Sequence, residues 1–149
     1  MLVVITGGAG SGKMEYAEAL IRKMCPDIKD PQFIRQYMIL RNLHLAGEHV
    51  LLSCIPDLLN QKVMELDPAS EDSVAESVFE DIMHIYRQAR NLVIVTEDMF
   101  AGVVLDPGIK KYLEEMGRLN QLLVAKADAF AEVVYEIPVF YKGADRIRK

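Results

Sequence analysis

The feature that most constrains this chain is a glycine-rich segment close to its N-terminus. An apolar run at residues 2–5 is followed by the seven residues Gly7-Gly8-Ala9-Gly10-Ser11-Gly12-Lys13, and a helical pattern of apolar residues begins directly after them. A strand, a glycine turn and a helix in this order form a phosphate-binding P-loop, whose Gly-x-x-x-x-Gly-Lys spacing is met by Gly7, Gly12 and Lys13. We therefore predict that residues 7–14 bind the phosphates of a nucleotide.

The chemistry of such a loop depends on its glycines and its lysine. Glycine adopts backbone conformations that are closed to other residues, so successive N–H groups can turn inward around an anion. The start of the following helix adds a partial positive charge, and Lys13 adds a full one. Thr6 or Ser11 could also donate a hydroxyl hydrogen bond. The alternative interpretation is a glycine-rich turn that only connects the strand to the helix.

One position departs from the full motif. A complete P-loop carries Ser or Thr after the lysine, and its hydroxyl binds Mg²⁺. This chain has Met14 there, and a thioether is a poor ligand for a hard cation that prefers oxygen. The sequence therefore predicts a site for GTP or ATP that lacks one usual magnesium contact, and it assigns no metal-binding residue.

The rest of the chain alternates short apolar runs with helical patterns. The predicted strands are at residues 2–5, 50–52, 92–95 and 130–134, and the predicted helices are at 13–24, 33–44, 73–89 and from Pro107 onward. This alternation predicts an α/β fold of three layers with a mostly parallel central sheet, as in P-loop NTPases. Because the chain has 149 residues and no evident linker, we predict a single nucleotide-binding domain spanning residues 1–149.

The predicted helices carry details that a structure can test. The helix at 33–44 is inferred from the spacing of Phe33, Tyr37, Leu40 and His44. Ser73 and Glu76 have the spacing of a capping box at the start of the next helix. The last helix is predicted to bury a face composed of Ile109, Leu113, Met116, Leu119 and Leu123.

Polar residues follow three of the predicted strands. The glycine loop follows the first, residues 53–57 follow the second, and residues 96–98 follow the third. Because ligands of parallel sheets bind at the carboxyl ends of the strands, we expect these segments to meet at one edge. There Glu97 and Asp98 would orient a metal-bound water or accept a proton from a substrate hydroxyl, which makes them candidate catalytic residues beside Lys13. The alternative is a solvated acidic loop.

Composition excludes several classes of function. The net charge of −5 argues against a broad nucleic-acid surface, because such surfaces are basic. No apolar stretch approaches the roughly 20 residues of a membrane span, and the first apolar run is too short for a signal peptide. Cys25 and Cys54 have no metal-ligand spacing, so we expect two free thiols in a reducing cytoplasm.

The second half of the chain resembles a known family. The most specific similarity is a Gly-x-x-Asn-Gln-x-x-Ala-x-x-Ala-Asp pattern, matched by Gly117, Asn120, Gln121, Val124, Ala127 and Asp128, with Val124 in place of the first Ala. Segments 50–55, 93–104 and 137–138 and the glycine loop are also similar. Together they resemble the adenosylcobinamide kinase/adenosylcobinamide-phosphate guanylyltransferase family of cobalamin biosynthesis. The resemblance covers about the first 25 residues and nearly all of the chain from His49 onward.

The resemblance implies a kinase that phosphorylates a hydroxyl of cobinamide with ATP or GTP, in a small homo-oligomer. Two of the departures from the family pattern concern magnesium, because the family's loop Ser is Met14 here and the Asp that ends its middle strand is Ser53. The family's region between the first helix and this strand is longer and carries a histidine that takes GMP, and neither His44 nor His49 can be assigned to it. A nucleotide-binding regulator or subunit without transferase activity, or a purely structural relative with an empty loop, therefore remains as an alternative.

Overall fold

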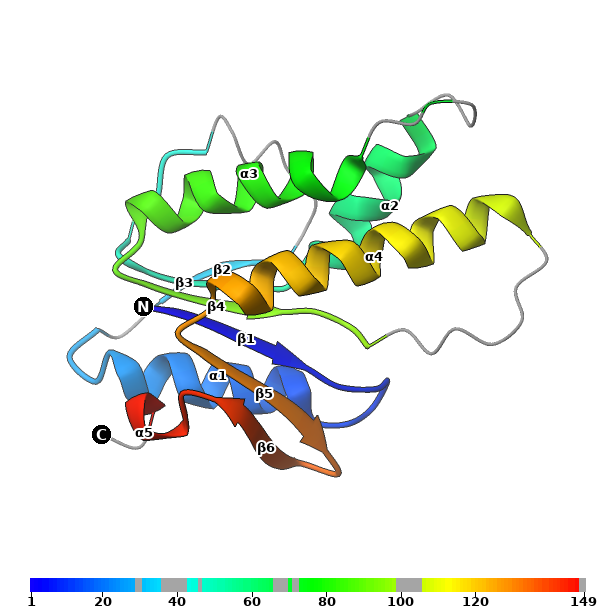
Figure 1. Cartoon of the computed structure of the whole chain (residues 1–149). Helices are drawn as coiled ribbons and strands as arrows, with labels where there is room; N and C mark the ends of the chain where they lie inside the picture. Colours follow the sequence, from blue (N-terminus) through cyan, green and yellow to red (C-terminus); the bar gives the residue numbers. More distant parts are fainter. Residues whose placement is uncertain are drawn as a thin grey trace.

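The computed structural model describes residues 1–28, 31–35, 43–45, 47–65, 70, 73–98 and 106–147. A six-stranded sheet forms the centre of the described molecule, in the order β2-β3-β4-β1-β5-β6. The strands are β1 (Leu2–Thr6), β2 (Gln32–Ile34), β3 (His49–Leu52), β4 (Asn91–Val95), β5 (Ala129–Val134) and β6 (Ile137–Lys142). All neighbouring strands run parallel except β6, which runs antiparallel to β5 (Figure 1).

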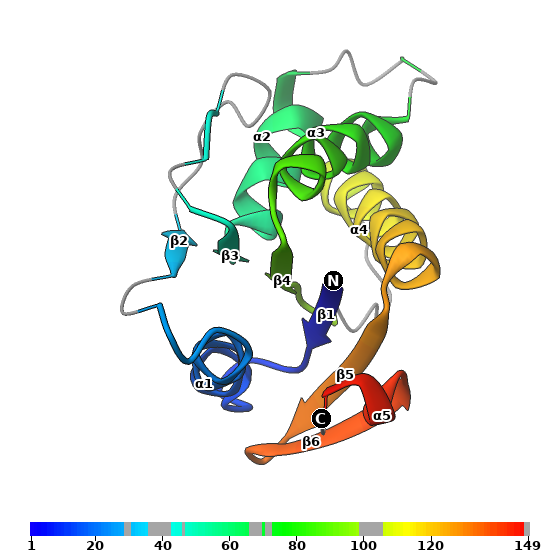
Figure 2. The same ribbon diagram turned by 90° about the vertical axis from the view of Figure 1, so that its left-hand side faces the viewer.

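Helices cover both faces of this sheet. They are α1 (Lys13–Met24), α2 (Ile55–Glu65), α3 (Val74–Gln88), α4 (Pro107–Lys126) and the short α5 (Ala144–Ile147). Figure 2 shows α1 on one side of the strands and α2, α3 and α4 on the other. The predicted α/β fold with three layers and a mostly parallel sheet is therefore confirmed.

The central strands are apolar on both faces because both faces are covered. Leu2 and Val4 of β1 contribute to the core beneath α2, α3 and α4. Val3 and Ile5 contribute to the second core, beneath α1. All four side chains are fully buried, which is why parallel strands appear in sequence as continuous apolar runs instead of alternating ones.

The predicted helix at 33–44 is wrong at both of its described ends. Phe33 lies in β2, where it pairs in register with Leu51 of β3. His44 is exposed and lies outside any helix, so it is not the partly buried packing residue that helical spacing suggested. Tyr37 and Leu40 lie outside the described residues. A helical spacing of apolar residues over a short segment does not outweigh the backbone pairing that a neighbouring buried strand offers.

Four of the described elements were not predicted, namely β2, the short α5, α2 and β6. The helix α2 begins directly after β3, with Pro56 in its first turn, where proline is tolerated because the N–H there has no helical partner. The strand β6 contains Pro138, which suits it because β6 is the edge strand of the sheet. In both cases a proline lies inside the element.

The start of α3 is stabilised by a residue distant in sequence. Ser73 is the N-cap, but its side chain makes no capping hydrogen bond to the helix, so the predicted capping box with Glu76 is wrong. Instead, the buried Glu115 of α4 accepts a hydrogen bond from the Ala75 backbone N–H at 2.7 Å. Glu76 pairs with Arg118 at 2.9 Å. The two helices are therefore joined where α3 begins.

Candidate functional site

The glycine loop connects β1 to α1 at the carboxyl edge of the sheet. Gly10 and Gly12 have φ angles of +69° and +85°, a left-handed conformation that favours glycine. A Cβ at Gly7 would lie 2.5 Å from Ser11 Oγ and 2.7 Å from the carbonyl oxygen of Val133. The loop therefore packs closely on itself and on β5, while Gly8, Ala9 and Gly10 are exposed at its tip.

The turn between β5 and β6 holds the loop from the other side. The Glu136 backbone N–H donates a hydrogen bond to the carbonyl oxygen of Ser11 at 2.8 Å. A Cβ at Gly12 would lie 2.7 Å from Cγ of Glu136. Tyr135 and Glu136 both have positive φ, at 49° and 66°, which fits a two-residue hairpin turn but is uncommon for residues other than glycine.

Three side chains of this region carry hydrogen-bonding groups suited to an anion. The Lys13 ammonium lies across the loop and donates to the carbonyl oxygen of Gly8 at 3.0 Å. The hydroxyl oxygens of Thr6 and Ser11 are buried without a hydrogen-bond partner among the described residues. Because buried polar atoms are nearly always paired, two unpaired hydroxyls beside one loop are the kind of exception that a ligand explains.

Met14 and Ser53, the two positions that depart from the magnesium-binding pattern, make other contacts in the structure. Met14 is partly buried and packs against the apolar core beneath α1. Ser53 follows β3, and its backbone N–H donates to the carbonyl oxygen of Ile34 at 3.0 Å. In the described part of the chain, no group of three or more His, Cys, Asp or Glu side chains could hold a metal ion. The donor set at positions 14 and 53 is one thioether and one hydroxyl, and it does not match the usual magnesium contacts.

The segment after β4 is held at the same edge by α4. The Thr96 hydroxyl donates to Oδ1 of Asn120 at 2.7 Å, and Nδ2 of Asn120 donates to the carbonyl oxygen of Glu97 at 3.0 Å. Glu97 is half-buried and Asp98 is exposed. One amide side chain of α4 therefore fixes the backbone that carries both acidic candidates, a role that sequence analysis did not assign to Asn120.

A small cavity lies where β1, β4 and β5 end, next to the acidic segment. It has a volume of about 280 Å³ and is lined by Thr6, Thr96, Asp98, Asn120, Val124, Phe130, Glu132 and Tyr141. Thr6 directly precedes the glycine loop and pairs in register with Glu132 of β5. Glu132 accepts a hydrogen bond from the Tyr141 hydroxyl at 2.9 Å, and this bond raises the pKa of Tyr141. Sequence analysis missed Glu132, because the pairing of β5 with β6 that creates this contact was not predicted.

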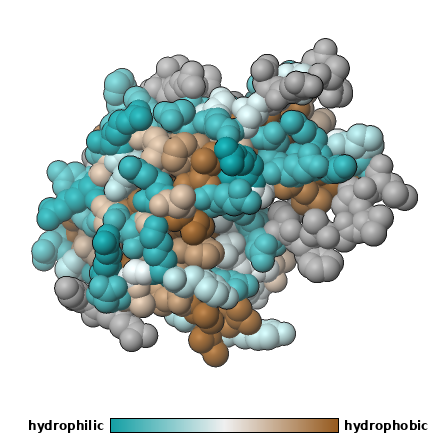
Figure 3. Space-filling view, in the orientation of Figure 1, coloured by the Kyte–Doolittle hydropathy of each residue, from teal (hydrophilic) through white to brown (hydrophobic). Residues whose placement is uncertain are grey.

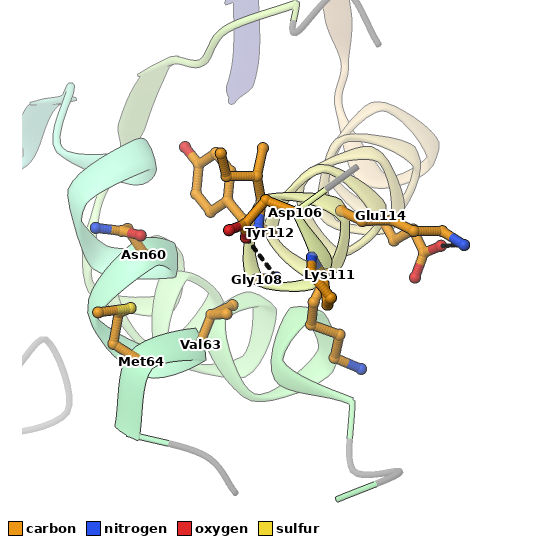
Figure 4. A pocket seen from close by; sticks show the side chains of 11 residues that line it. Asn60, Val63, Met64, Asp106, Gly108, Lys111, Tyr112 and Glu114 are labelled. Carbon is orange, nitrogen blue, oxygen red and sulfur yellow. Dashed lines mark hydrogen bonds and ion pairs between the residues drawn. The ribbon is translucent and has the colours of Figure 1, made fainter. Parts of the chain in front are cut away.

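A larger cavity of about 730 Å³ lies between α2 and the first turns of α4 (Figure 4). Tyr112 lines it from α4. Burial raises the pKa of Tyr112, and the negative charges of Glu97 and Asp57 raise it further. One helical turn further along α4, the Met116 sulfur lies 3.8 Å from the Thr96 hydroxyl, which places this part of α4 beside the carboxyl edge of the sheet.

The histidines and cysteines take no part in this arrangement. His49 is buried, and its Nδ1 lies 2.9 Å from the side-chain nitrogen of Asn91. Both cysteines are free and buried. Burial raises the pKa of the Cys54 thiol to about 11, so it is not a nucleophile near neutral pH. No helix in the described part of the chain is long and apolar enough to cross a membrane.

Comparisons with known proteins show what the chain is similar to. A family model described as cobinamide kinase / cobinamide phosphate guanyltransferase matches residues 28–140. The chain is 28% identical to the bifunctional adenosylcobalamin biosynthesis protein CobU of Salmonella typhimurium strain LT2, over 182 residues that cover 95% of this chain and 100% of the relative. That alignment is longer than this 149-residue chain, so the relative carries segments that this chain lacks. The family match begins after the glycine loop, so the function of the loop must be argued from its geometry.

Proposed function

Because the chain belongs to the cobinamide kinase / cobinamide phosphate guanyltransferase family, we propose that it binds GTP or ATP in its glycine loop and phosphorylates a cobinamide hydroxyl. Residues 1–149 would act as one nucleotide-binding domain. The observation that carries the proposal is the loop itself, in which two buried hydroxyls without described partners lie beside the Lys13 ammonium at the start of α1. Backbone N–H groups and a cation at a helix N-terminus form a site for phosphate.

Different residues would serve nucleotide binding and phosphoryl transfer. Residues 7–14 would cradle the phosphates, with Lys13 reaching the terminal ones. The acceptor oxygen would bond to the γ-phosphorus while the bond from that phosphorus to the bridging oxygen breaks, and the nucleoside diphosphate would leave. Glu97 or Asp98 would accept the proton of the acceptor hydroxyl. Phosphoryl transfer depends mainly on positioning and charge neutralisation, and here Lys13 would supply the neutralising charge.

A second candidate is favoured by the packing of Met14. Because its thioether contributes to the core beneath α1, the oxygen that usually binds magnesium at this position is missing. The chain would then be a nucleotide-binding regulator or subunit that has lost transfer. The two candidates differ in magnesium dependence, since a working kinase needs substitute oxygen ligands whereas a regulator binds nucleotide equally well without the ion.

We also propose a cellular location and an oligomeric state for the protein. Two free thiols are typical of a reducing cytoplasm, where we place its activity. A small homo-oligomer fits the apolar side chains exposed on the β5–β6 hairpin, which form part of the apolar surface at the lower edge of Figure 3. The proposed partners are the nucleotide and cobinamide.

Calorimetric titration of the purified chain with GTP and ATP, with and without Mg²⁺, tests the proposal directly. We expect binding of a nucleotide and a loss of affinity of about tenfold or more in Lys13→Ala, because a cation near phosphate is replaced by a methyl group. Lys23→Ala is the matched control, since Lys23 is exposed at the far end of the same helix. Unchanged affinity in Lys13→Ala would remove the glycine loop from the nucleotide site.

Restoration of the missing oxygen separates the two candidates. If transfer is limited by the metal contacts, Met14→Ser combined with Ser53→Asp should increase the magnesium dependence of binding and the rate of cobinamide phosphorylation. If the unmodified chain shows no detectable phosphorylation and the double variant does, the result favours a natural chain that acts as a regulator. Strong magnesium dependence and turnover already present in the unmodified chain would favour the kinase.

A further inference from the structure

The large cavity between α2 and α4 has the composition of a ligand site. Its volume of about 730 Å³ is within the usual range for small-molecule pockets. One wall is formed by Asn60, Val63 and Met64 of α2, and the other by residues 106–114 before and within the first turns of α4 (Figure 4). The walls combine apolar side chains with amide, carboxylate and ammonium groups, which suits an amphipathic ligand.

Two apolar side chains of this cavity are more exposed than folding alone explains. Met64 is 78% exposed and Ile109 is 54% exposed. Ile109 was predicted to belong to the buried face of α4, and this prediction is wrong because the helix passes beyond the sheet and core at its first turns (Figure 1). Exposed apolar groups that rim a concave surface are typical of a binding site.

The position of the cavity relative to the acidic segment indicates what it would bind. Tyr112 lies in its wall, half-buried, one helical turn before Met116, whose sulfur lies 3.8 Å from the Thr96 hydroxyl at the end of β4. A ligand body held in the cavity would therefore lie next to the edge where Glu97 and Asp98 follow β4.

We propose that the cavity between α2 and α4 holds the body of the phosphate acceptor, with Tyr112 positioning the acceptor's hydroxyl-bearing arm beside Glu97. This inference rests on the proposed function and extends it to the location of the acceptor. The acceptor is an amphipathic macrocycle with amide side chains, as cobinamide is, whose apolar edge packs on Met64 and Ile109. Its amides find hydrogen-bond partners in Asn60 and the Lys110 ammonium.

The rest of the cavity supports an uncharged acceptor over an anion. The carboxylate of Asp106 is already used as the N-cap of α4, where it accepts hydrogen bonds from Gly108 and Ile109 at 2.8 and 3.0 Å. Lys111 pairs with Glu115 at 3.0 Å. The cap removes the backbone donors that would attract an anion to this helix end.

Binding of cobinamide to the full-length chain, followed by its visible absorbance or by calorimetry, tests the location. The variants Met64→Glu and Ile109→Glu place a charge on exposed positions, so the fold should be retained. We expect each to weaken cobinamide binding by about tenfold or more, because apolar contacts are replaced by a carboxylate. Affinity for GTP or ATP should be unchanged. The matched control is Ile28→Glu, beyond the end of α1, where the side chain is 40% exposed.

The role of Tyr112 is tested separately, by comparing kcat with KM and cobinamide affinity in a Tyr112 variant. Tyr112→Phe keeps the ring and removes only the hydroxyl, so cobinamide affinity and KM should stay close to those of the unmodified chain. We expect kcat to fall by about tenfold if the phenol orients the acceptor arm. A fall in affinity with kcat unchanged would assign Tyr112 to packing and overturn this part of the proposal.

The outcomes separate this inference from the proposed function. Cobinamide binding that is insensitive to Met64→Glu and Ile109→Glu, or lost in Ile28→Glu instead, would overturn the location. A change of oligomeric state in the cavity variants, measured by size-exclusion chromatography with light scattering, would mark the cavity as a contact between copies and also overturn it. Loss of nucleotide binding in Lys13→Ala with cobinamide binding intact supports both proposals. No nucleotide binding by the unmodified chain, with cobinamide still bound in the cavity, overturns the proposed function alone.

Discussion

The glycine loop and the segment after β4 reach the same edge of the sheet, but they are held there by different means. The loop is shaped by its own glycines and by one backbone hydrogen bond from Glu136. The segment after β4 is anchored by the side chain of Asn120, which comes from a helix more than twenty residues further along the chain. The first arrangement is mostly local, and the second exists only because α4 packs on the sheet.

The glycine loop and the segment after β4, the two halves of the site, should therefore respond differently to substitutions. The loop tolerates few changes at Gly7 and Gly12, because a Cβ added at either meets backbone or a packed side chain. The acidic half of the site, residues 96–98 after β4, should instead be sensitive to substitutions in α4 that leave Glu97 and Asp98 in place. The four predictions below test this contrast.

The largest effect is expected at Gly12. Gly12→Ala adds a Cβ at a φ of +85° and 2.7 Å from Cγ of Glu136, so we expect a loss of about 1–3 kcal/mol in the free energy of unfolding. Urea denaturation measures it. Gly8→Ala is the control, because no atom lies within 4 Å of the Cβ it adds, and its effect should stay within about 0.5 kcal/mol. Equal effects at the two glycines would show that the close packing of the loop does not matter for stability.

The next effect is expected at Asn120. Asn120→Ala removes the acceptor of the Thr96 hydroxyl and the donor to the Glu97 carbonyl oxygen, which should cost about 1–2 kcal/mol of stability. Transfer to cobinamide should fall as well, whereas nucleotide affinity should change little. The neighbouring exposed Gln121, changed to Ala, controls for helix effects. If nucleotide binding suffered as much as transfer, the two halves of the site would not be independently held.

A smaller effect that depends on pH is expected at Glu115. Burial raises its pKa, but hydrogen bonds from Lys111 and from the Ala75 backbone N–H outweigh burial, so its pKa lies below the ordinary value of 4.5. Its carboxylate therefore stabilises the fold fully above pH 4.5, and this contribution is lost as the pH falls through the lowered pKa. We expect Glu115→Gln to lose about 1 kcal/mol at pH 7 and to differ less from the unmodified chain in strong acid.

Denaturation at several pH values checks this expectation. The control is Glu114→Gln, since Glu114 lies on the same helix and is largely exposed. A constant difference between Glu115→Gln and the unmodified chain from neutral pH to strong acid would contradict the assignment of a stabilising carboxylate. The comparison also shows how far the α3–α4 contact supports the acidic half of the site.

The smallest effect on stability is expected at Ser11. Its hydroxyl oxygen is buried without a partner among the described residues, so Ser11→Ala removes an unpaired polar group and should change stability by no more than about 0.5 kcal/mol. Nucleotide affinity should nevertheless fall several-fold, as calorimetry would show. A marked loss of stability with unchanged nucleotide affinity would mean that the hydroxyl serves the fold and not a ligand.

Much of the fold was predictable because it follows from short-range patterns. The strands β1, β3, β4 and β5 and the helices α1, α3 and α4 all lie where apolar runs and helical spacing predicted them. The failures among the strands lie at the margins of the sheet. Phe33 belongs to an edge strand, and Pro138 lies inside another. Edge strands are short and only partly buried, so their sequences carry weak patterns.

The sequence by itself determined the strand, glycine turn and helix at the N-terminus, the position of Lys13, and the absence of an oxygen ligand at Met14. Each depends on residues adjacent in the chain, where backbone sterics and helix geometry leave few choices. Only the tertiary structure decided that Asn120 holds the segment after β4, that Glu115 caps α3, and that α2 and α4 enclose a cavity. These features join residues far apart in sequence, and no local pattern specifies which distant side chains packing will bring together.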